Sequence, residues 1–61
     1  MFIKSFIVEI NSSLEHMYEQ LDDAGLNYTV EQFDDGYLIV SFEALSNREI
    51  QDAMHIMKWY V

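Results

Sequence analysis

The side chains that could do chemistry in this 61-residue chain are its carboxylates, two histidines and a few serines, since it contains no cysteine. His16 lies beside Glu15 and close to Glu19, and His55 follows Asp52 by three residues. Two ligands on one helical turn do not complete a zinc site, which is usually four-coordinate. We therefore predict no metal site, no cofactor, and histidines that are exposed to solvent.

Catalysis has no better support. The chain has no Gly-rich phosphate loop, no Ser/His/Asp spacing and no calcium-loop pattern. Ser12 and Ser13 have no base at a defined spacing to activate them, and they precede an apolar stripe as capping residues do. A chain this short can hardly enclose a catalytic pocket, which is typically about 300–1,000 Å³. We predict that the protein is not an enzyme.

The carboxylates are more informative as a charged surface. The chain has 11 acidic and 3 basic residues, a net charge of −8. This charge disfavours direct binding to nucleic acid or to an anionic membrane, and it favours a protein partner with a basic surface. Glu15, Glu19 and Asp22 recur at helical spacing, with no lysine or arginine between them. The predicted acidic surface comprises Glu15, Glu19, Asp22, Asp23, Asp34 and Asp35.

Such a row of carboxylates could imitate the phosphates of DNA and so block the basic cleft of a DNA- or RNA-binding enzyme. Against this, the Asp34–Asp35 pair is expected at the opposite end of the sheet from the Asp22–Asp23 pair. The charge would then be spread out, and solubility is the simpler role. Both interpretations stay open.

The composition favours one ordered domain over residues 1–61. Hydrophobic residues make up 51% of the chain and aromatic residues 15%, and there is no proline or linker-like run. The apolar stretch near the beginning contains Lys4 and Glu9 and is too short to span a bilayer. With no cysteine and no visible targeting signal, we expect a cytoplasmic protein, or one in the host cytoplasm if it is viral.

Periodicity predicts the order β-α-β-β-α. The first strand is Phe2 to Ile10, whose even-numbered residues are the more apolar set and should face the core. A capping box at Ser12–Glu15 predicts the start of the first helix, and Gly25 predicts its end. The apolar stripe of this helix is Leu14, Met17, Tyr18 and Leu21.

The last helix should begin at a second capping box, Ser46–Glu49. Its predicted apolar stripe is Ile50, Ala53, Met54, Met57 and Val61, widened near the end by Ile56, Trp59 and Tyr60.

The segments 27–33 and 37–44 are predicted strands joined by a three-residue loop, Asp34-Asp35-Gly36, with Gly36 in the left-handed region. This loop pairs Phe33 with Tyr37 and puts Tyr28, Val30, Leu38, Val40 and Phe42 on the core face. A two-residue Asp35-Gly36 loop would slip the register and put Glu31 on the core face, so we reject it.

These elements are most simply buried in an α+β fold, a three-stranded antiparallel sheet with both helices on one face. A right-handed crossover places the third strand between the first and the second. The arrangement resembles a ferredoxin-like fold that lacks its last strand. That likeness is topological only, and the fold is too versatile to imply a function.

This fold would leave one face of the sheet open, with the free edge of the first strand beside it. The predicted partner-binding residues on this face are Ile3, Ile7, Phe33, Tyr37 and Ile39. A patch of large apolar side chains of this kind is typical of an interface. The alternative is that one helix covers the second face and closes it.

In size, charge and lack of catalytic motifs, the chain resembles the short acidic proteins of tailed bacteriophages, which bind and disable a host or defence enzyme. That resemblance implies an inhibitor or modulator that binds another protein through its apolar sheet face or its first-strand edge. An obligate homodimer that uses the same surface is the main alternative, and the DNA mimic is the other.

Overall fold

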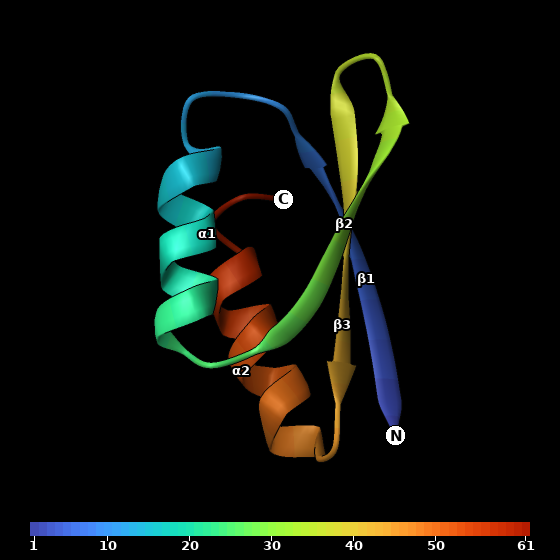
Figure 1. Cartoon of the computed structure of the whole chain (residues 1–61), viewed down its shortest axis with the longest axis vertical. Coiled ribbons are helices and arrows are strands. Elements are labelled where there is room, and N and C mark those ends of the chain that lie inside the picture. Colours follow the sequence, from blue (N-terminus) through green and yellow to red (C-terminus); the bar gives the residue numbers. More distant parts are fainter.

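The computed structural model describes all residues, 1–61, and places both helices on the same side of an open sheet (Figure 1). The elements are β1 (Phe2–Glu9), α1 (Leu14–Asp23), β2 (Asn27–Asp34), β3 (Tyr37–Ala44) and α2 (Asn47–Met57). The sheet order is β1-β3-β2, and both pairings are antiparallel. The α+β prediction is confirmed, with β1 and β2 at the two edges and no helix on the second face.

The core lies between the sheet and the helices. Its buried side chains come from alternate positions of β1 and β3 and from one stripe of each helix: Val8, Met17, Leu21, Val40, Phe42, Ala44, Ala53 and Met57. The predicted stripe of α1 is confirmed, because Met17 and Leu21 are fully buried while Leu14 and Tyr18 pack against the core cluster.

The inward-facing set of β1 is buried only in part. Val8 is buried and Phe6 packs against the core, but Phe2 and Ile10 are 46% and 43% exposed. β1 is an edge strand with a neighbour on one side only, so its two ends have little to pack against.

The predicted stripe of α2 is wrong at its margin. Ala53 and Met57 are fully buried, whereas Met54 and Val61 are 47% and 66% exposed and Trp59 is 75% exposed. The Tyr60 hydroxyl donates a hydrogen bond to Oε1 of Gln20 on α1. This contact lies on the α1 side of the helix, and the flank that carries Met54 and Val61 is exposed.

The hairpin has the predicted strand register, but its turn is shorter than predicted and β2 contains a bulge. Val30 pairs with Val40 as expected, but Asp34, not Phe33, pairs with Tyr37. The loop is therefore the two-residue Asp35-Gly36 turn that we had rejected, and Gly36 does not adopt the left-handed conformation. Phe33 is the extra residue of a β-bulge, and this bulge absorbs the one-residue slip that the shorter loop would otherwise cause.

Of the helix boundary signals, the Ser46–Glu49 capping box and the Gly25 stop are present. The Ser46 hydroxyl accepts a hydrogen bond from the amide of Glu49, whose carboxylate in turn accepts from the amide of Leu45. Gly25 has φ of 70°, and the amide of Leu26 reaches back to the carbonyl of Leu21, which closes a Schellman motif.

The Ser12–Glu15 capping box does not form. The N-cap of α1 is Ser13, which makes no side-chain cap. Instead, Oδ1 of Asn11 accepts a hydrogen bond of 2.8 Å from the amide of Ser13. Asn11 thus satisfies a free amide at this helix start, which leaves the Ser12 hydroxyl without its predicted role.

Neither α1 nor α2 is long and apolar enough to cross a membrane.

Candidate protein-binding surface

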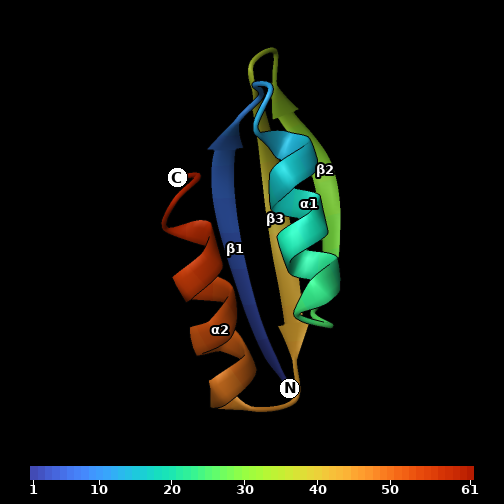
Figure 2. The ribbon, with the colours of Figure 1, turned by 90° about the vertical axis from the view of Figure 1, so that its left-hand side faces the viewer.

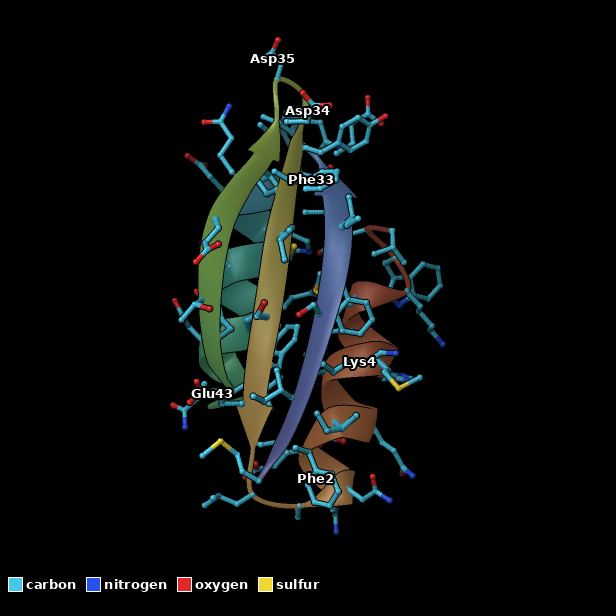
Figure 3. The ribbon with its side chains drawn as sticks, turned by 90° about the vertical axis from the view of Figure 1, so that its right-hand side faces the viewer. Phe2, Lys4, Phe33, Asp34, Asp35 and Glu43 are labelled. Atoms are coloured by element: carbon cyan, nitrogen blue, oxygen red, sulfur yellow. The ribbon has the colours of Figure 1, made fainter.

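Strand β3 is central to the open face of the sheet, the face that no helix covers. Successive side chains of β3 point alternately toward the helices and toward this open face. Val40 and Phe42 point toward the helices and are buried, whereas Tyr37, Ile39 and Glu43 point the other way. Figure 3 shows this open face, with Phe33 near the hairpin tip and Glu43 toward the opposite end.

The register of the three strands divides the open face into rows. Nearest the hairpin, Tyr37 lies between Glu9 of β1 and the bulge at Phe33. In the next row Ile39 lies between Ile7 and Glu31. Ile7, Phe33, Tyr37 and Ile39 therefore form one group, which we call the hairpin-end patch. Its outer members are substantially exposed: Ile7 50%, Phe33 55% and Tyr37 45%.

Ile3 does not belong to this patch, although we predicted that it would lie with the other four residues. It lies opposite Glu43, and the row between it and the patch is made of hydroxyl side chains, Ser5, Ser41 and Thr29. The hydroxyl oxygens of Ser5 and Ser41 are 2.9 Å apart and hydrogen-bonded. Ile3 and Ile7 are four positions apart along β1, a distance of about 13 Å. The predicted site is thus split by a polar row.

The charges are segregated between two halves of the molecule. Residues 11–37, which contain α1 and β2, carry seven carboxylates and no lysine or arginine. All three basic residues, Lys4, Arg48 and Lys58, lie on β1 or in and just after α2. Segments 1–10 and 47–61 together carry three acidic and three basic residues, so they have no net charge.

Two hydrogen bonds fix the direction in which the acidic row of α1 points. Asp22 accepts a hydrogen bond of 3.1 Å from the Tyr28 hydroxyl on β2, while Gln20 accepts one from Tyr60 on the α2 side. Glu15 and Glu19 share the Asp22 side of α1, and both are exposed. The predicted row therefore lies on the β2 side of α1, away from α2. Figure 2 shows α1 next to β2.

The only titratable group with a clear shift is the phenol of Tyr28. Burial raises the pKa of Tyr28 above its usual value of 10.0, and the hydrogen bond to the Asp22 carboxylate and the charge of that carboxylate add to the rise. The shift reflects how Tyr28 is held between α1 and the sheet, with its ring stacked on Tyr18.

The other predicted acidic residues are exposed as well, Asp34 and Asp35 at the hairpin tip and Asp23 at the end of α1. The tip and the end of α1 lie toward opposite ends of the molecule, as predicted (Figure 1).

His16 and His55 are exposed, and no three His, Cys, Asp or Glu side chains are grouped to hold a metal ion. An open depression of about 330 Å³ on α2 is lined by Gln51, Met54, His55 and Lys58.

Sequence reasoning missed a second exposed apolar group. Phe2 of β1, Met54 of α2 and Val61 were predicted to be core residues, yet each is about half exposed or more. A signal was present in the sequence: Met54 is one residue after Ala53 and therefore about 100° around the helix from that fully buried residue. We call Met54 and Val61 the outer flank of α2.

The geometry supplies an exposed apolar patch, a charged half and a neutral half, and no assembled catalytic or metal-binding group. Comparison with known protein families, curated proteins and solved structures finds no match.

Proposed function

We propose that this protein is a small protein-binding module that docks another protein on its open sheet face and thereby inhibits or modulates that partner. The observation that carries the proposal is the hairpin-end patch. Ile7, Phe33 and Tyr37 are each about half exposed on a face that no helix covers. Aromatic side chains at the centre of such a patch supply a large share of the binding energy in protein interfaces.

The carboxylates near this patch give the partner a further property. Glu9 and Glu31 lie beside it in the rows defined by the register, and Asp34 and Asp35 lie at the hairpin tip. Acidic side chains around an apolar centre favour a partner whose own apolar site has a basic rim. The proposed place of action is the cytoplasm, supported by the lack of cysteine in the chain.

The proposal is tested by capturing partners from a lysate of the cells in which the protein occurs, using wild type and the double variant Phe33→Ser plus Tyr37→Ser. The variant should stay folded and lose the captured protein. Leu45→Ser is the matched control, because Leu45 is 82% exposed in the β3–α2 connection, outside the patch. A captured protein that remains bound to the double variant would remove the proposal.

A second candidate is a mimic of nucleic acid that occupies a basic cleft. The segregation of seven carboxylates into the α1–β2 half favours it, because that half has no lysine or arginine to neutralise them. In this case Glu15→Lys, Glu19→Lys and Asp22→Lys together abolish binding, and binding falls steeply as salt rises. Unchanged binding by this triple variant would contradict the nucleic-acid mimic, and it would leave the proposal of docking on the hairpin-end patch unaffected.

A further inference from the structure

The two edges of the sheet differ in how well they are protected. The β2 edge has a bulge at Phe33, the charge of Glu31, and the acidic row of α1 alongside it. These are features that discourage the addition of another strand. β1 has no bulge, and its only charged residues are Lys4 and the terminal Glu9. The β1 edge is therefore the one open to pairing.

The pattern of hydrogen bonds between β1 and β3 shows which backbone groups of β1 have no partner on β3. The amide of Ile10 donates a 2.8 Å bond to the carbonyl of Gly36, the residue opposite it in the β1–β3 register. In an antiparallel pair, hydrogen-bonded and non-hydrogen-bonded positions alternate. The even-numbered residues of β1 thus bond to β3, and the N–H and C=O groups of Ile3, Ser5 and Ile7 point outward.

Helix α2 determines what can reach this edge. It lies on the helix side of the sheet next to β1 and extends past that strand, in both Figure 2 and Figure 3. Helical spacing puts Met54 and Val61 about 100–120° around the helix from Tyr60, which bonds to α1, so these two exposed residues lie on the flank that is turned away from α1. Phe2 of β1 is exposed on the same side.

A second copy of this chain would bring its own α2 to the edge as an obstacle. Two copies paired through β1 would each bring an α2 that extends beyond its own β1 (Figure 2). The two helices would then compete for the same space above the junction, because packed helices need about 8–10 Å between their axes. A single extended segment has no such helix.

The charges near β1 suggest the composition of that segment. Glu9 ends β1, and the bond from Ile10 to Gly36 holds the tip carboxylates of Asp34 and Asp35 near this end. A strand that runs antiparallel to β1 has its amino end there. Basic residues at that end would be favoured by attraction to these carboxylates.

We propose that the free edge of β1, beneath the outer flank of α2, binds an extended segment of a partner protein as a fourth strand. The segment runs antiparallel to β1, has apolar residues on its helix side and has basic residues at its amino end. This inference rests on the proposed function, since it names the kind of segment that the docked partner contributes. Backbone hydrogen bonds supply the affinity, and contacts with Phe2, Met54 and Val61 supply the preference for apolar side chains.

The probe is a synthetic nine-residue peptide of two lysines followed by alternating valine and threonine. NMR hydrogen exchange on the labelled protein should show fast exchange at the amides of Ile3, Ser5 and Ile7, and slow exchange at Lys4, Phe6 and Val8. The peptide should slow the three fast amides at least tenfold. A peptide with glutamates in place of the lysines should bind several-fold more weakly. Unchanged exchange at Ile3, Ser5 and Ile7 would overturn the inference.

Two variants test the geometry. Ser5→Pro removes an N–H that points outward, so it should leave the β1–β3 ladder intact and weaken peptide binding at least tenfold. Met54→Glu keeps the backbone unchanged and should weaken binding several-fold, whereas Leu45→Glu should have no effect. Peptide binding that survives both Ser5→Pro and Met54→Glu contradicts the proposed site, as does a protein that is already a dimer through β1.

Failure of this inference can be told apart from failure of the proposed function. Loss of the captured partner in the Phe33→Ser plus Tyr37→Ser variant, together with no peptide binding at β1, leaves patch docking in place and removes the fourth strand. Peptide binding at β1, together with partner capture that the patch variant does not change, removes patch docking instead.

Discussion

The two helices start with the same pattern, a serine followed three residues later by a glutamate, and they use it differently. At α2, Ser46 caps the amide of Glu49, and the Glu49 carboxylate accepts from Leu45. At α1, Asn11 accepts from the amide of Ser13, and the N-cap residue makes no side-chain bond. The difference teaches that a capping pattern in the sequence need not form, and that a nearby asparagine can bond to a different amide at the helix start.

The helices differ in their surroundings as well. α1 is tied to β2 by Tyr28 and to the α2 side by Tyr60, and its outer face is acidic. Segment 47–61, which contains α2, has no net charge and leaves Met54 exposed on the outer flank of α2. The half of the molecule with α1 is therefore charged and closed at its edge, whereas the half with α2 is neutral and open.

The largest expected effect is a difference in stability between substitutions on the buried side and on the exposed side of α2. Met57→Ala should lower the free energy of unfolding by about 2–5 kcal/mol, because Met57 is fully buried and the change leaves a cavity. Met54→Ala is the same substitution at a residue that is 47% exposed, and it should cost less than about 0.5 kcal/mol. Urea unfolding followed by far-UV circular dichroism measures both. Equal losses would mean that α2 is rotated relative to the structure described above.

The helix ends give the next comparison. α1 stops at Gly25 with φ of 70°, whereas α2 passes into a turn through Lys58 without a left-handed residue. Gly25→Ala should destabilise the protein by about 1–2 kcal/mol, the strain of a left-handed alanine, since no atom lies near enough to clash. Gly36→Ala, where φ is not positive, is the control and should change the unfolding midpoint little. A harmless Gly25→Ala would contradict the Schellman stop.

The two helix starts should differ by a smaller amount. Ser46→Ala should lower the free energy of unfolding by about 1 kcal/mol, because it leaves the amide of Glu49 without its cap. Ser12→Ala should be close to neutral, within about 0.5 kcal/mol, since Ser12 makes no capping bond. Thermal and urea unfolding of the pair provide the measurement. Similar losses would show that Ser12 caps α1 in solution.

The smallest effect concerns the bond that ties α1 to β2. Tyr28→Phe removes the hydrogen bond to Asp22 and should cost about 0.5–1 kcal/mol at neutral pH. Because the pKa of Tyr28 is raised in the folded protein, the fold holds this proton more tightly than the unfolded chain does. The associated stability is present below pH 10 and is lost as pH rises above it. Unfolding at pH 8 and pH 11 should therefore show a smaller difference between wild type and Tyr28→Phe at pH 11.

Much of the fold was predictable because the local signals agree with one another. Alternation identified Val40 and Phe42 as the inward side of β3, and helical spacing identified Met17 and Leu21. Gly25 marked the end of α1, because few other residues adopt its conformation easily. These features depend on neighbours within a few residues along the chain, so the sequence alone was enough to locate them.

The candidate site was less predictable, because it depends on contacts between segments far apart in the chain. Whether Met54 is buried is decided by the rotation of α2 against α1 and the sheet, and the contact between those helices joins residues 40 apart in the sequence, Tyr60 and Gln20. The bulge at Phe33 was missed because a two-residue turn and a kept register exclude each other in a regular ladder.

The sequence by itself determined the order of the elements, the inward face of each strand, the end of α1 and the net charge of −8. Only the tertiary structure decided that a row of hydroxyls separates Ile3 from the hairpin-end patch, and that segments 1–10 and 47–61 come together in a half with no net charge. The physical reason is that composition and periodicity act along the chain. Strand register and helix rotation instead bring together side chains that the sequence keeps apart.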